Sequence, residues 1–152
     1  MADSSGVTVL PEHTCWELLR SAEVGRLAVV ADAQPDIFPI NFVVDHGTIV
    51  FRTAAGSKLA AASSNRVAFE VDGYDSETGE AWSVVIKGRA EEIKQLHERI
   101  ESMDLPLFPW HAEPKPHVVR VVPETITGRR FQVVDSAAWG TSAPGARRQP
   151  PE

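Results

Sequence analysis

Short apolar runs separated by tight turns dominate this chain and leave little of it for helices. Seven runs have the length and the residue types of β-strands. They span residues 26–31, 37–44, 48–53, 67–72, 82–90, 117–122 and 126–134. A parallel doubly wound sheet would need a helix after almost every strand. The pattern therefore predicts a mainly β fold, a closed or nearly closed antiparallel barrel.

The run 67–72 has the pattern of a strand with one buried face. Val67, Phe69 and Val71 point to one side, and the polar residues of the run point to the other. The polar segment 73–80 that follows is expected to be a long hairpin connection. The acidic residues of this region are interpreted as a solvated face: Glu70, Asp72, Asp75, Glu77 and Glu80.

Two short amphipathic helices are expected beside the strands. The first follows Pro11, with Thr14 and Glu17 at the spacing of a capping box, and Gly25 is a plausible end for it. The second covers residues 91–103, where apolar residues recur at helical spacing.

The length and composition fit one domain with loose ends. With 43% apolar residues in 152, the chain can build a real core. We expect a flexible lead at 1–9, a folded domain at 10–135 and a flexible tail at 136–152, where Ser, Ala, Gly, Pro and Arg are frequent.

Charge and cysteine usage exclude several classes of function. A net charge of −6 argues against nucleic acids and anionic membranes as partners. No apolar run approaches the length of a membrane-spanning helix, and the N-terminus lacks the pattern of a signal peptide. Cys15 is the only cysteine, so no internal disulfide forms and a cytoplasmic location is expected. The five histidines show no paired ligand spacing, so no metal site is predicted.

The segment 51–58 carries the strongest functional signal. An apolar strand ends in Arg52 and Thr53, and a turn containing Ser57 and Lys58 then opens a short Ala-rich helix. Arginine grips phosphate oxygens with parallel hydrogen bonds, and a helix N-terminus favours an anion. The segment predicts a phosphate site, and the alternative is a set of solvated charges around an ordinary turn.

Pro39 lies inside an otherwise strong strand, where proline cannot donate a ladder hydrogen bond. It therefore marks an edge or a bulge, where neighbouring backbone groups are free to bind something else. A flat heteroaromatic ring would suit Pro39, Ile40 and Asn41. An edge strand with a solvent-facing Asn41 explains the same residues equally well.

Three further residues are candidates because of their chemistry. Trp82 and Ser83 open a predicted strand, and Trp82 can also be explained as core. Trp110 lies in a proline-rich loop, where a ring-stacking or interface role suits it better than a core role.

Several segments in series resemble the pyridoxamine 5′-phosphate oxidase-like family of flavin-binding split barrels. The resemblance rests on residues 25–30, 39–45, 51–59, 67–73, 79–90 and 118–129, and it covers most of 10–134 in the right order. The branch that the chain resembles most includes small actinobacterial flavin-nucleotide-binding proteins and nitroimidazole-resistance-type reductases.

The resemblance implies a six-stranded antiparallel split barrel that forms a homodimer, with FMN at the subunit interface. It implies that Arg52, Ser57 and Lys58 hold the FMN phosphate with help from Thr53. Further implied contacts with the flavin are Pro39, Ile40 and Asn41 beside the ring, Trp82 and Ser83 close to it, and Trp110 from the partner subunit.

The activity that the resemblance implies is that of a flavin-dependent oxidoreductase acting on a small organic substrate. No catalytic residue stands out, because the cofactor carries the chemistry in such enzymes. Vitamin B6 oxidation is not assigned, because the basic C-terminal set of the authentic oxidases is missing here. A deazaflavin-dependent reductase and a non-catalytic flavin carrier or sensor remain as alternatives.

Overall fold

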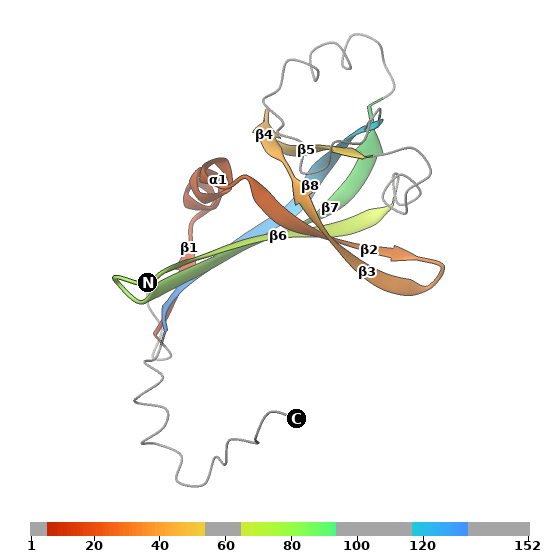
Figure 1. Ribbon diagram of the computed structural model, residues 1–152. Coiled ribbons are helices and arrows are strands. Elements are labelled where there is room, and N and C mark those ends of the chain that lie inside the picture. Colours follow the sequence, from red (N-terminus) through yellow and green to blue (C-terminus); the bar gives the residue numbers. More distant parts are fainter. Residues whose placement is uncertain (1–5, 54–64, 94–116, 134–152) are drawn as a thin grey trace, which may run out of the picture.

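An eight-stranded antiparallel sheet curls into a half-barrel in the computed structural model (Figure 1). The structure describes residues 6–53, 65–93 and 117–133. The strands are β1 (Val7–Leu10), β2 (Val24–Ala31), β3 (Gln34–Asn41), β4 (Val43–Asp45), β5 (Thr48–Thr53), β6 (Arg66–Asp75), β7 (Glu80–Glu92) and β8 (His117–Gln132). The helix among the described residues is α1 (Glu12–Ser21).

The strand order is β3-β2-β6-β7-β8-β5-β4, and β1 pairs with β8. The first residues of the long strand β8 pair with β5, and its last residues pair with β1. Both strands lie on the side of β8 opposite to β7. The hairpin of β6 and β7, together with the end of β8, extends away from the curled part of the sheet (Figure 1). This architecture is the predicted split barrel, with eight strands instead of six.

The two additional strands have simple causes. β1 begins at Val7, within the segment that we expected to be a flexible lead. The run predicted at 37–44 is divided by Phe42, which belongs to neither β3 nor β4. Phe42 points into the core, and its N–H donates to the carbonyl of Glu23, 3.1 Å away.

Two predicted strands are in fact the single strand β8. Pro123 lies where we expected a break, but it pairs with Gly88 at a register shift between β7 and β8. A bulge tolerates proline because the ladder is already interrupted there. A Cβ at Gly88 would lie 2.1 Å from the carbonyl oxygen of Val122, so glycine permits this close approach.

The connection between β6 and β7 is a tight turn, and the prediction of a long one at 73–80 is wrong. β6 continues to Asp75 and β7 starts at Glu80. The carboxylate of Asp75 accepts hydrogen bonds from the N–H groups of Glu77 and Thr78, at 2.9 and 3.3 Å. These bonds and the positive φ of Gly79 (71°) close the turn locally.

The helix predictions were partly wrong. α1 starts after Pro11, whose carbonyl accepts the N–H of Thr14, so Thr14 lies inside the first turn and forms no capping box. Gly25 does not end the helix but lies in β2, where an added Cβ would be 2.4 Å from the ring of Phe69. The second predicted helix does not begin at 91, because β7 continues to Glu92, and residues 94–103 lie outside the described residues.

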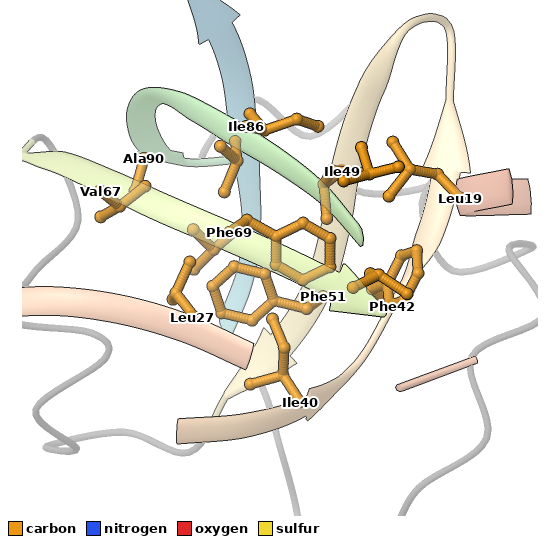
Figure 2. Packing of buried hydrophobic residues seen from close by; sticks show 14 of the residues in the cluster. Leu19, Leu27, Ile40, Phe42, Ile49, Phe51, Val67, Phe69, Ile86 and Ala90 are labelled. Carbon is orange, nitrogen blue, oxygen red and sulfur yellow. The ribbon is translucent and has the colours of Figure 1, made fainter. Parts of the chain in front are cut away.

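The main core fills the concave side of the sheet (Figure 2). Phe42 and Phe69 meet edge to face, with ring centroids 4.8 Å apart. Leu19 and Cys15 of α1 close this core from one end. A second, smaller cluster of Val50, Ile93 and Val118 lies on the opposite face of β5 and β8. None of the described helices is long and apolar enough to cross a membrane.

Candidate functional site

The end of β5 carries the first predicted group, Arg52 and Thr53. Successive residues of a strand point to opposite faces. Arg52 lies on the outer face with Val50, which belongs to the second cluster, whereas Thr53 points inward and is 3% exposed. The two side chains therefore flank the strand end from both faces, and do not converge on one face as the sequence interpretation assumed.

The second predicted group lies on β3, an outermost strand in the sheet order. This position confirms the inference that Pro39 marks an edge. Pro39 and Asn41 point outward, and Pro39 pairs with Arg26 of β2. Ile40 points inward and is buried in the main core, so its side chain packs there and does not reach a ligand on the outer face.

The fold brings these two groups together at the seam where the half-barrel closes. Strands β3 and β5 contact each other across this seam. In the core below it, Ile40 packs beside Phe51, the residue before Arg52 (Figure 2). The two strands that carry the predicted groups are thus neighbours within one chain.

Trp82 and Ser83 lie elsewhere. Trp82 is ten residues before Glu92 on β7, about 30 Å of extended strand. Glu92 pairs with Val119, which in turn faces Phe51 of β5. Trp82 packs against the main core, as the core alternative proposed, and Ser83 points to the outer face. Within a single chain, these two residues do not form one pocket with Arg52.

Three predicted site residues, Ser57, Lys58 and Trp110, lie outside the described residues. Their roles stay predictions. The site is therefore built here from Arg52, Thr53 and the outward edge of β3.

An ion-pair cluster adjoins the β3 edge, and the sequence analysis missed it. Arg26 Nη2 lies 2.5 Å from Asp72 Oδ1 and 3.1 Å from Glu70 Oε2. Asp72 is exposed, as the interpretation of a solvated face predicted, whereas Glu70 is partly buried, and both acids are ion-paired. Hydrogen bonding to Asp72 raises the pKa of Arg26, and burial, with the charge of Asp72 adding to it, raises the pKa of Glu70. The only local signal was an arginine inside an apolar strand.

A second titratable pair was also missed. His117 Nδ1 and Glu92 Oε1 are in hydrogen-bonding contact between β8 and β7. His117 is the register partner of Thr53, so the pair stands directly beside the end of β5. No spacing in the sequence indicates it, because residues 92 and 117 meet only through the strand register.

A groove of about 310 Å³ opens beside the β3 edge. Its walls come from the end of α1 and from the β3–β4 junction: Leu19, Arg20, Ala22, Glu23, Asn41, Phe42, Val43 and Val44. Asn41 is the only predicted site residue among them. Among the described residues, no group of three or more His, Cys, Asp or Glu side chains is placed to hold a metal ion.

The half-barrel and its edge define the class of protein. The curled, antiparallel sheet has the strand arrangement of a split barrel. The family model described as pyridoxamine 5′-phosphate oxidase matches residues 11–130. The chain belongs to this family.

Solved structures agree with this assignment. The FAD binding protein from Mycobacterium smegmatis is 41% identical, with a TM-score of 0.73 over 82% of this chain and 98% of that one. A FAD-binding protein from Mesorhizobium loti is 26% identical, with a TM-score of 0.71 over 83% of this chain and 99% of that one. A relative known from sequence, the uncharacterized protein Rv0080 of Mycobacterium tuberculosis, is 32% identical over 86% of this chain and 88% of its own.

Proposed function

We propose that this protein binds a flavin nucleotide at the seam between β3 and β5. The observation that carries the proposal is the contact between β3, which carries Pro39 and Asn41 on its outer face, and β5, which ends in Arg52 and Thr53. The similarity to two FAD-binding proteins supports it.

The residues present fit such a ligand. A guanidinium at a strand end suits a phosphate, because it supplies donors in a fixed fork. Backbone groups on the outer side of β3 suit the polar edge of a flat ring, since that strand is outermost in the sheet order. Asn41 adds an amide that both donates and accepts.

The identity of the flavin is part of the proposal. The sequence prediction is FMN, whereas the names of the two similar solved structures favour FAD. Both nucleotides carry a ribityl phosphate, so the same guanidinium serves either one. The deazaflavin coenzyme is the third ligand to be compared.

We further propose a homodimer with the cofactor at the subunit interface. Ser83 points outward on an arm of the sheet that extends from the barrel, far along β7 from Arg52. A two-fold axis allows Ser83 of the partner subunit to approach the Arg52 site, which one chain alone does not permit.

The proposed activity is oxidation or reduction of a small organic substrate. A bound flavin supplies hydride and electron transfer. The protein's own residues would bind and orient it: Arg52 fixes the phosphate, and the β3 edge fixes the ring. No described side chain is assigned to proton transfer with the substrate.

Binding is tested by titrating the purified protein with FMN, FAD and the deazaflavin coenzyme and by monitoring the quenching of fluorescence. Saturable binding of a flavin supports the proposal, and absence of binding by all three removes it. Anaerobic reduction of the bound flavin by a nicotinamide donor, then reoxidation by nitroaromatic or quinone acceptors, separates an enzyme from a carrier. Tight binding with no reaction identifies the carrier.

A further inference from the structure

The outer face of the sheet carries exposed apolar side chains. Side chains alternate between the two faces of a strand, and the inward ones fill the main core. The large apolar side chains that stay exposed on the described strands all point outward: Val9, Val30, Ile37, Tyr74, Val122 and Phe131. Exposed apolar surface gathered on one face is typical of a surface that binds another protein, and two sheets pack well face to face.

The charges on the outer face of the β6–β7 hairpin are separated along the strands. Lys87 and Arg89, both exposed on β7, form its basic end. Glu70 and Asp72, on β6, form its acidic part. This arrangement is one that a second copy of the same hairpin can complement.

A two-fold axis at right angles to β7, midway between Ser83 and Arg89, brings the two charge groups together. It sets Ser83 of one copy against Arg89 of the other. Asp72 is the register partner of Ser83, so its Cβ lies about 5 Å from that position. By the same rotation, Lys87 of one copy arrives beside Glu70 of the other.

Other charges on this face modify the attraction without reversing it. Arg26 lies 2.5 and 3.1 Å from the two carboxylates of the acidic part, which leaves one negative charge in excess there. Arg66 lies 3.3 Å from Glu124 and is matched within its own chain. Arg129 is a cation on β8 beside the acidic part, and the rotation sets it against Val122. Farther from the axis, Arg120 is paired with Asp45 and stands beside Glu91.

We propose that two copies of this chain pair through the outer face of the β6–β7 hairpin, with the basic end of each hairpin against the acidic part of the other. This surface presupposes the proposed homodimer and names the residues that form it. It also turns Ser83 of the second copy toward the end of β7 that adjoins β5, the direction that the proposed cofactor site requires.

The experiment exchanges charges across the proposed surface. Sedimentation equilibrium of the full chain, in the presence of FMN, measures the dimer dissociation constant of wild type, Arg89→Glu, Asp72→Lys and an equimolar mixture of these two variants. Each variant alone sets like charges against each other at both symmetric contacts, so we expect its dimer to be about 100-fold weaker. In the mixture both contacts again join opposite charges, so we expect a dimer of one chain of each variant with nearly the wild-type dissociation constant. Arg20→Glu, at an exposed position of α1, is the control and is expected to dimerise as wild type does.

Wild-type dimerisation by both single variants would overturn the inference. Folded variants that stay monomeric in the mixture would overturn it too, with circular dichroism as the measure of folding. If Asp72→Lys does not fold, a chain with Ser83→Cys and Arg89→Cys is treated with a thiol cross-linker of about 10 Å reach, the usual spacing of packed sheets. The two positions are about 20 Å apart in one strand, so only a second copy can be linked, and Cys15 is buried. A covalent dimer supports the surface, and its absence contradicts it.

Two outcomes separate this surface from the proposed function. A monomeric wild type overturns the surface together with the proposed homodimer. A wild type that dimerises and passes the charge exchange, but binds no flavin, supports the surface and contradicts only the flavin site.

Discussion

Gly73 of β6 lies directly against the indole ring of Trp82, its register partner on β7. A Cβ at position 73 would lie 2.5 Å from both Cε2 and Nε1 of that ring. Glycine therefore gives the tryptophan a flat backbone surface on the inner side of the arm. An aromatic ring that covers a glycine across two strands is a known way to stabilise such a pair.

Gly73→Ala is expected to destabilise the protein by about 1–2 kcal/mol, because the new methyl group displaces the indole. Urea denaturation measures the free energy of unfolding. The matched control is the same substitution in a Trp82→Ala background, where the obstacle is absent and the cost is expected to be much smaller. Equal costs in the two backgrounds would show that the contact is unimportant.

Glu70→Gln is expected to be more stable than wild type by an amount that grows as pH rises from 4 to 7. The pKa of Glu70 is raised by burial and by Asp72, so its contribution is present below the unfolded pKa of about 4.3 and is lost as pH rises through the folded pKa. Glutamine removes that loss. We expect the gain over wild type to grow with pH and to stay below about 1 kcal/mol.

Thermal unfolding of both proteins at several pH values measures this effect. Glu77→Gln, in the exposed β6–β7 turn, serves as control. A gain over wild type that shrinks toward pH 7 would contradict the expected direction of the pH dependence.

Cys15→Ala is expected to reduce the loss of stability at alkaline pH. Burial, with a smaller contribution from Glu12, raises the pKa of the Cys15 thiol. The folded chain therefore keeps its proton while the unfolded chain begins to lose it near pH 8.5, so stability falls as pH rises beyond that value. Free energies of unfolding at pH 7 and 9.5 check this, and the difference between the two pH values is expected to be up to about 1 kcal/mol larger in wild type. An identical difference would contradict the assignment.

Sedimentation equilibrium tests the proposed dimer. We expect a dimer with cofactor present, because Ser83 lies near the start of β7, whereas the register brings the other end of β7, at Glu92, toward Phe51 and Arg52 of β5. A monomer in the presence of saturating flavin would contradict both the dimer and the idea that the arm completes the site.

The sequence predicted local features well where a residue type has a direct effect on the backbone. β5 was predicted at its observed bounds, Thr48–Thr53, because the turn before it places His46 and Gly47 at positive φ. Pro39 correctly indicated an edge, since proline interrupts a ladder. The break predicted between residues 122 and 126 is wrong, because the bulge opposite Gly88 accommodates Pro123 inside β8.

The arrangement of the site was harder to predict because it depends on register between distant segments. Arg26 meets Glu70 only because β2 pairs with β6. His117 meets Thr53 only because the start of β8 pairs with the end of β5. The separation of Trp82 from Arg52 follows from the length of β7. The local sequence pattern does not show which end of a long strand lies near the site.

The flavin titration of wild type and Arg52→Ala tests the central claim most directly. Loss of a charge-assisted hydrogen bond costs about 1.5–3 kcal/mol, so we expect affinity to fall about 10- to 100-fold. Arg66→Ala is the matched control, because Arg66 is an exposed arginine of β6 that pairs with Glu124, three strands away from β5 in the sheet order. The account predicts weak flavin binding for Arg52→Ala and unchanged binding for Arg66→Ala. Equal affinity in all three proteins would contradict it.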